Sequence, residues 1–91
     1  MIFDMLSEQR LRDVLSKVEG ATDVFVGREG QKLIGIVVSP AFEGKEEHER
    51  QSEVWGLLIE NFTDEEHAEV GFVFTNTPAE KAEAERQAAA G

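Results

Sequence analysis

The residues best suited to chemistry lie in one polar stretch, residues 46–51, at the start of a predicted helix. His48 and Gln51 are three residues apart, which places both side chains on the same face of that helix. An imidazole is a good ligand for iron, whereas a neutral amide is a weak one. His48 is therefore either a candidate metal ligand or a plain exposed histidine near a helix start. His67, the other histidine, has no ligand pattern around it.

The sequence offers no arrangement typical of a catalytic site. Catalysis by a side chain needs a nucleophile beside a base, or two carboxylates in a cleft. Glu46, Glu47 and Glu49 crowd the first turn of the predicted helix, where the positive end of the helix macrodipole accounts for them. The chain has no cysteine, so it has no thiolate for a metal or a substrate. We expect no enzymatic activity, no catalytic residue and no cofactor bound by the chain alone.

Charge is unevenly distributed along the chain, whose formal net charge is −10. Residues 43–69 contain ten acidic residues and two basic ones, Lys45 and Arg50, whereas residues 1–42 contain six acidic and five basic residues. Nucleic-acid binding depends on cations that displace phosphate counterions, so this balance disfavours it. The acidic segment is either a solvated surface or a surface that matches a basic patch on a partner protein.

Several features favour a cytoplasmic location. No apolar run approaches the roughly 20 residues that cross a bilayer, and residues 1–6 are too short, and too acidic at Asp4, for a secretory signal. The absence of cysteine fits a reducing compartment. We expect no membrane contact, and a monomer or a weak dimer.

The first half of the chain predicts a helix followed by two strands. Ser7 is a good N-cap, with Asp4 as a competing cap one turn earlier, and Gly20 is a natural end for the helix. Apolar residues recur at helical spacing between Ser7 and Gly20. Residues 23–26 and 32–39 predict the strands, joined by a tight connection over residues 27–31. The second strand is almost continuously apolar, which is typical of a strand covered on both faces.

The second half predicts a long helix, a strand and a last helix. Residues 45–62 have a helical apolar stripe, residues 63–69 are a polar connection, and residues 70–74 alternate as a strand with Val70, Phe72 and Phe74 on one face. Thr77 to Glu80 form a capping box with Pro at the first helical position. We expect one domain over residues 1–80 and an Ala- and Glu-rich helical tail over residues 81–91 that frays.

The element order α-β-β-α-β-α predicts an α+β fold. A short turn makes the first two strands antiparallel, and a helical crossover makes the third parallel to the second. The prediction is a three-stranded mixed sheet with the main helices packed on one face.

Residues 38–45, Val-Ser-Pro-Ala-Phe-Glu-Gly-Lys, run into Arg50, Val54 and Trp55. This segment resembles the signature of the BolA-like family. Thr75 and the turn at residues 77–78 resemble the family's junction between its last strand and last helix. The resemblance covers about residues 7–80. It implies a fold similar to that of class II KH domains, although the chain lacks a GxxG loop of the RNA-binding kind.

The resemblance also implies a function. Members of the family are associated with monothiol glutaredoxins in iron–sulfur cluster handling, and others are described as stress-responsive regulators that bind DNA. A non-enzymatic adaptor is implied, which binds a monothiol glutaredoxin and shares a 2Fe-2S cluster with it. The implied partner-binding residues are Phe42, Gly44, Lys45, Arg50 and Gln51.

The chain departs from the family at the cluster ligands. Gln51 stands where the family usually has a histidine, and residues 27–31 offer neither the His nor the Cys that some members use. A shared cluster is then held through His48 or is not held, in which case the ligand role is lost. Lys45 and Arg50 are either solvated or paired with Glu49 and Glu53, or they point outward to a carboxylate-bearing ligand such as glutathione.

The remaining signature residues have structural explanations, and other functions stay open. Phe42 is expected to fill the core, and Gly44 to supply an unusual backbone angle before the helix. One alternative function is a KH-like transcription regulator that binds nucleic acid through its few cations: Arg28, Lys32, Lys45 and Arg50. Another is a regulatory module with an unrelated partner.

Overall fold

The computed structural model describes residues 6–90; residues 1–5, including Asp4, and residue 91 lie outside the described part. The elements are, in order, α1 (Glu8–Leu15), β1 (Asp23–Glu29), β2 (Lys32–Val38), the 3-10 turn η1 (Pro40–Phe42), α2 (Glu47–Asn61), α3 (Asp64–His67), β3 (Val70–Asn76) and α4 (Pro78–Ala90). The predicted order is confirmed, and η1 and α3 are short additions in the connections. Among the described residues, no helix has the length and apolarity needed to cross a membrane.

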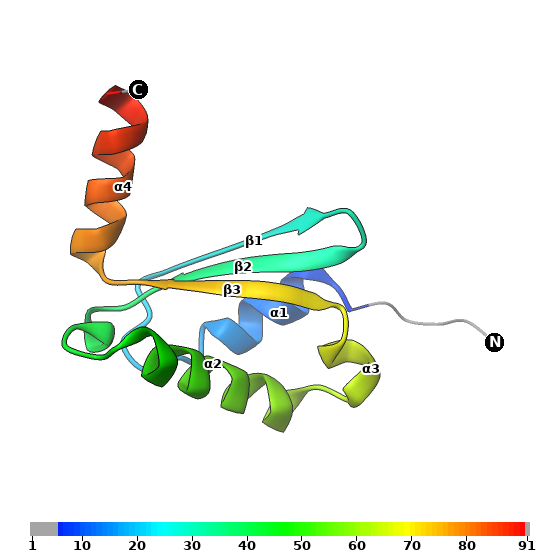
Figure 1. Cartoon of the computed structure of the whole chain (residues 1–91). Coiled ribbons are helices and arrows are strands. Elements are labelled where there is room, and N and C mark those ends of the chain that lie inside the picture. Colours follow the sequence, from blue (N-terminus) through cyan, green and yellow to red (C-terminus); the bar gives the residue numbers. More distant parts are fainter. Residues whose placement is uncertain (1–5, 91) are drawn as a thin grey trace.

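The three strands form one mixed sheet with β2 in the middle. β1 is antiparallel to β2, and β3 is parallel to it. Helices α1 and α2 lie against one face of this sheet (Figure 1), as the sequence predicted. The core between them is formed by buried side chains of α1, α2 and the inner face of the sheet: Leu11, Leu15, Leu33, Val37, Phe42, Val54, Leu58 and Val73.

Ser7 caps α1 as predicted, since its hydroxyl accepts a hydrogen bond of 3.1 Å from the Arg10 backbone N–H. The helix ends at Leu15 rather than near Gly20, and a series of turns follows it. Gly20 still has a positive φ of 71°. A Cβ there would lie 3.0 Å from the Ser39 hydroxyl. That buried hydroxyl donates to the Glu19 carbonyl at 2.6 Å, so it ties this connection to the end of β2.

The connection predicted over residues 27–31 is wrong, because the turn contains only Gly30 and Gln31. Gly27 and Arg28 are paired strand residues, and the last pair of the hairpin is Glu29 with Lys32. Gly30 has a φ of 63°, the positive value that a type II′ turn needs at its first central residue. A glycine-rich sequence can still form a strand when a partner strand supplies the hydrogen bonds, because strand formation depends strongly on context.

The expectation that β2 is covered on both faces is also wrong for the described chain. Leu33 and Val37 are buried against the helices, but Ile34 and Ile36 on the other side are half-buried. That side of the sheet carries large apolar side chains from all three strands, and we call it the open face: Phe25, Ile34, Ile36, Phe72 and Phe74. Figure 1 shows no helix layer over it, only α4 rising beside one end.

Val70 does not share a face with Phe72 and Phe74, in contrast to the simple alternation predicted from the sequence. Val70 pairs with Leu33 and is buried, whereas Phe72 pairs with Ile34 and is 39% exposed. The register shifts between these two pairs, so Gly71 is an extra residue in β3. Such a β-bulge reverses the in–out alternation beyond it. The bulge therefore turns both phenylalanines away from the core.

Helix α4 begins with the predicted capping box. The Thr77 hydroxyl accepts from the Glu80 N–H at 3.1 Å, and the Glu80 carboxylate accepts from the Thr77 N–H at 2.7 Å. The helix extends to Ala90, has no buried residue, and projects on the side of the open face (Figure 1). The division into a domain over residues 1–80 and a fraying tail over residues 81–91 stays a prediction.

The close packing of α1 on the sheet gives a stability test with an internal control. A Cβ at Gly35 would lie 2.7 Å from Leu15 Cδ1, and Leu15 is fully buried. We expect Gly35→Ala to lower the free energy of unfolding by about 1–3 kcal/mol, because the buried Leu15 side chain would have to shift within the core to make room for the added methyl group. Gly27→Ala meets no atom within 4 Å and should be neutral or stabilising by up to about 1 kcal/mol. Urea unfolding measures both, and equal effects would contradict the packing.

Candidate partner-binding site

The candidate site is the segment that leaves β2 and enters α2. Phe42 is fully buried, as expected, and the Arg50 guanidinium lies over its ring at 5.7 Å from the centroid. Gly44 is exposed and has a φ of 78°, so the expected unusual backbone angle is confirmed. The Lys45 N–H donates to the Phe42 carbonyl across this tight turn at 3.1 Å. A buried ring and a left-handed glycine thus set the path of the loop.

Lys45 is paired with Glu53, one of the two carboxylates that the sequence suggested. Its ammonium lies 3.0 Å from Glu53 Oε2, and the side chain is about one third exposed. The hydrogen bond to Glu53 raises the pKa of Lys45 above its ordinary value. The ammonium is therefore held along α2 while remaining accessible from solvent.

Arg50 points into the molecule, and its acidic partner is neither Glu49 nor Glu53. Its Nε donates to the Lys45 carbonyl at 3.0 Å, and its Nη1 donates to Glu80 Oε1 at 2.7 Å and to the Thr75 carbonyl at 3.3 Å. The residue is only 8% exposed. A buried guanidinium needs several acceptors to offset its lost hydration. Arg50 obtains them from the loop, β3 and α4.

Glu80 has two roles, since its carboxylate accepts from both the Arg50 side chain and the Thr77 N–H. The hydrogen bond from Arg50, followed by that from Thr77, lowers the pKa of Glu80 below its ordinary value. The sequence identified Glu80 only as a helix-capping residue. Its pairing with a residue 30 positions away has no local sequence signal.

The Gln51 side chain is committed to hydrogen bonds inside the molecule. Its Nε2 donates to the Val73 carbonyl and to Glu47 Oε1, both at 2.9 Å, and its Oε1 accepts from Trp55 Nε1 at 2.9 Å. Both amide N–H groups are therefore used, and the side chain ties α2 to the backbone of β3. An amide in this network serves structure and is not free to take a ligand.

The two histidines have opposite environments. The side chain of His48 is 78% exposed and its Nδ1 lies 3.5 Å from a Glu46 carboxylate oxygen. His67 packs edge-on against Trp55, 5.0 Å between ring centroids, and its Nε2 is buried without a hydrogen-bond partner among the described residues. Within residues 6–90, no three His, Cys, Asp or Glu side chains are grouped as a metal site would require. His48 could therefore offer one ligand at most.

The predicted site residues thus divide into two sets. Phe42, Arg50 and Gln51 face inward and hold the loop against the sheet. Gly44, Lys45 and His48 lie on the outer side, among exposed carboxylates of residues 43–49. We call residues 43–49 the outer loop; this segment includes the first turn of α2. Its surface is rigidly supported and mainly acidic.

Comparisons with known proteins agree with this geometry at the level of the fold. No protein-family model and no curated protein matches the sequence. Several solved structures do resemble it, including three BolA proteins or domains. BolA1 from Arabidopsis thaliana superposes with a TM-score of 0.64 at 22% identity, over 80% of this chain and 93% of that one. A BolA protein homologue from Coxiella burnetii superposes with a TM-score of 0.68 at 19% identity, over 86% of this chain and 99% of that one. The BolA domain of SufE1 from Arabidopsis thaliana superposes with a TM-score of 0.60 at 24% identity, over 80% of this chain and 93% of that one.

The chain has the BolA fold. The match spans almost the full length of the three similar structures. At this level of identity the likeness concerns the path of the backbone. The roles of the individual side chains rest on the contacts described above.

Within this BolA fold, the cations suggested for nucleic-acid binding are engaged in internal contacts. Arg28 donates to the Leu6 carbonyl at 3.0 Å and lies 3.8 Å from a Glu8 oxygen. Lys32 donates to the Ala68 carbonyl. Lys45 and Arg50 have the carboxylate partners already described. These four cations do not form a free basic patch, and this weakens the nucleic-acid alternative.

The Arg50–Glu80 contact should make stability depend on pH. A carboxylate whose pKa is lowered by folding stabilises the protein above its unfolded pKa, and this contribution is lost as the pH falls through the folded pKa. We expect the free energy of unfolding to decrease below pH about 4.5, and Glu80→Gln to reduce that decrease.

Part of the slope of the free energy of unfolding against pH should remain in Glu80→Gln. A hydrogen bond from the Thr63 N–H and another from Arg10 also lower the pKa of Glu66. Denaturant unfolding between pH 3 and 7 measures the slope, with Glu60→Gln in α2 as the control. An identical slope in wild type and Glu80→Gln would show that the Arg50 contact does not form.

Proposed function

We propose that this chain is a member of the BolA-like family that acts as a non-enzymatic, protein-binding adaptor. The observation that supports this most is the arrangement of the signature segment, in which three inward side chains hold the outer loop against the sheet. A surface fixed in this way can dock a partner without a large loss of conformational entropy.

The charge of the outer loop suggests the kind of partner. Its exposed residues are mainly glutamates, and Lys45 is neutralised by Glu53. A partner with a basic patch would be steered to this surface, and the attraction would weaken with added salt. A monothiol glutaredoxin is the partner implied by the family resemblance, in iron–sulfur cluster handling or stress-linked regulation. The contacts of this chain support an acidic docking surface, and the glutaredoxin is the specific candidate for it.

The residues of this chain do not fit a 2Fe-2S cluster held alone. The Gln51 amide is fully engaged, and His48 is a single exposed imidazole. A cluster shared with a glutaredoxin could take one ligand from His48. Otherwise the chain would bind the glutaredoxin without contributing to the cluster. We favour the second arrangement, because His48 is exposed in the first turn of α2 and belongs to no group of three His, Cys, Asp or Glu side chains among residues 6–90.

A titration with a cluster-loaded monothiol glutaredoxin tests the proposal. Calorimetry measures binding, and visible circular dichroism measures any change in the ligands of the cluster. We expect wild type to bind without a change in the spectrum, and His48→Ala to behave in the same way. Gln51→His places an imidazole on the same helix and should alter the spectrum if the family's geometry is retained.

The other outcomes separate the alternatives. A spectral change in wild type that is lost in His48→Ala would make His48 a ligand. Absence of binding by calorimetry would exclude the glutaredoxin, and a pull-down from native lysate would then seek an unrelated partner. Turnover of a small compound, or iron held tightly by the purified chain alone, would contradict the adaptor function.

A further inference from the structure

The open face is a continuous apolar surface built from two cross-strand rows. The first row is Phe25, Ile36 and Phe74, and the second is Gly27, Ile34 and Phe72. Phe25 and Phe74 are 49% and 50% exposed, and Phe72 and Phe74 pack edge-on at 4.8 Å. A soluble domain rarely exposes three phenylalanines together on one side of a sheet, and such a patch indicates an interaction surface.

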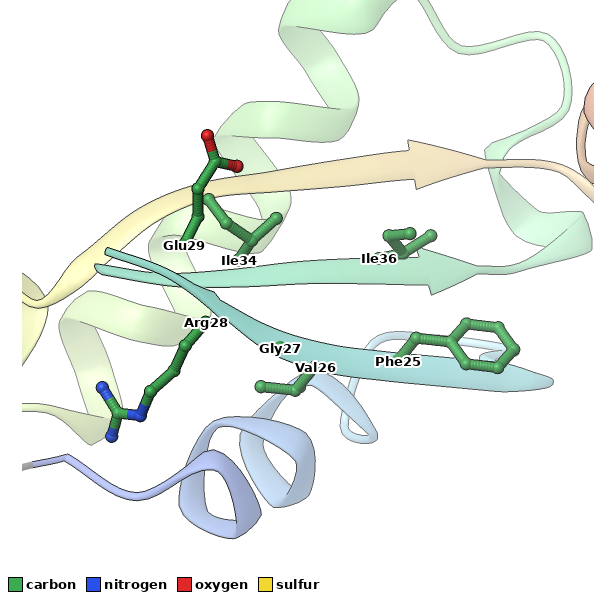
Figure 2. A pocket seen from close by; sticks show the side chains of 7 residues that line it. All are labelled: Phe25, Val26, Gly27, Arg28, Glu29, Ile34 and Ile36. Atoms are coloured by element: carbon green, nitrogen blue, oxygen red, sulfur yellow. The ribbon is translucent and has the colours of Figure 1, made fainter. Parts of the chain in front are cut away.

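The open face has both a hollow and protruding phenylalanine rings. Because Gly27 has no side chain, a hollow of about 280 Å³ lies in the second row beside Ile34. Figure 2 shows Ile34, Ile36 and Glu29 on the side of the sheet opposite to Val26 and Arg28, around the position of Gly27. A surface that contains both rings and a hollow can match a rotated copy of itself, which is what a two-fold interface requires.

Helix α4 stands beside one end of the open face (Figure 1). A second hollow lies between the first row and α4, lined on the helix by Lys81, Ala84, Glu85 and Ala88. The Arg50–Glu80 contact and the Thr77 cap hold the first turn of α4, which opposes a swing of the helix down onto its own sheet. Its 13 residues are about 20 Å long, and the seven-residue strands are about 23 Å long. An α4 from another molecule would therefore match the length of the strands.

We propose that the open face and α4 pair with the same surfaces of a second copy of this chain. In this arrangement each α4 lies on the sheet of the other molecule, and the two Ala-rich faces pack side by side across the two-fold axis. This inference rests on the exposed aromatic rows and the fixed α4, and it is independent of the glutaredoxin proposal.

The charges near the interface favour a second copy over a basic or a nucleic-acid partner. The chain as a whole carries −10, but the charged residues that border the open face are nearly balanced, three acids and two bases: Asp23, Glu29, Lys32, Lys81 and Glu85. The ten acids of residues 43–69 lie largely on α2, α3 and the loops before them, away from this face. A partner that recognises charge would find little to bind here, whereas a second copy presents the same nearly balanced, apolar surface.

The area is consistent with a weak dimer. Three half-exposed phenylalanines offer about 250–300 Å², and one side of α4 adds a similar amount. Each molecule would then bury about 500–600 Å², near the lower limit of specific interfaces. Repulsion between two chains of charge −10 opposes association, and salt screens it. Association through this face should therefore tighten as salt is added, opposite to binding through the acidic outer loop.

Sedimentation equilibrium from 5 to 500 µM, at 0.05 and 0.5 M NaCl, tests the proposal with matched variants. Phe74→Lys places a charge in the first row, on the β3 side of the face, and Ile59→Lys makes the same change at an exposed position of α2. We expect a dimer whose dissociation constant rises at least tenfold in Phe74→Lys, changes less than twofold in Ile59→Lys, and falls with salt. A wild type that stays monomeric at 500 µM in 0.5 M NaCl overturns the proposal, and so do equal effects of the two variants.

A second pair of variants serves if Phe74→Lys does not fold. Ala84→Glu lies on the side of α4 that lines the hollow, and Ala82→Glu lies about 160° further round the same helix. Only Ala84→Glu should weaken the dimer, and equal weakening by both contradicts the role of α4.

The position of α4 can be read directly because the chain has no cysteine of its own. A nitroxide is attached to Gln87→Cys in unlabelled protein, which is then mixed with nitrogen-15-labelled wild type. Broadening of the amides of Phe25, Ile36 and Phe74 in the labelled molecule supports the exchange of α4 between copies. Broadening of these amides only in a second sample, in which the spin-labelled variant itself carries nitrogen-15, would show that α4 covers its own sheet, and would overturn the proposal. A single-stranded oligonucleotide that binds wild type but not Phe74→Lys would reassign the face to base stacking.

Discussion

The guanidinium of Arg50 is buried where the outer loop, β3 and α4 meet, and a buried cation is tolerated only with acceptors around it. It obtains them from the Lys45 and Thr75 carbonyls and from Glu80. Each acceptor belongs to a different part of the chain. The contact therefore sets the start of α2, the end of β3 and the direction of α4 together. Removal of these acceptors would release the outer loop and α4, and it would leave the buried Arg50 guanidinium unpaired.

The neighbouring Gln51 performs a similar task with a neutral group. Its amide joins Glu47, Trp55 and the backbone of β3. The signature segment therefore serves mainly to position the outer loop, and its defining side chains are largely buried and not accessible to a partner. The groups left outside are mainly carboxylates. Recognition through this surface would depend on shape and negative charge, with His48 as the one imidazole in reach.

The sheet has two unlike faces, and one extra residue in β3 adds two phenylalanines to the open face. The bulge at Gly71 keeps Val70 and Val73 in the core while turning Phe72 and Phe74 outward. Together with Phe25 and the two isoleucines of β2, they form an apolar surface without a helix layer (Figure 1). The acidic outer loop and the apolar open face lie on different sides of the molecule. A partner protein and a second copy could therefore bind without competing for the same residues.

Local patterns in the sequence were sufficient for the element order, the mixed sheet, the caps at Ser7 and Thr77, and the roles of Phe42 and Gly44. These features depend on spacing within a few residues, and helical periodicity, capping and positive φ act at that range. Tertiary structure alone decided the bulge that reverses Phe72, the open side of β2, and the partners of Arg50 and Gln51. A register shift depends on the neighbouring strand, and a buried polar side chain takes whichever acceptor the fold brings to it, here a carboxylate 30 residues further along the chain.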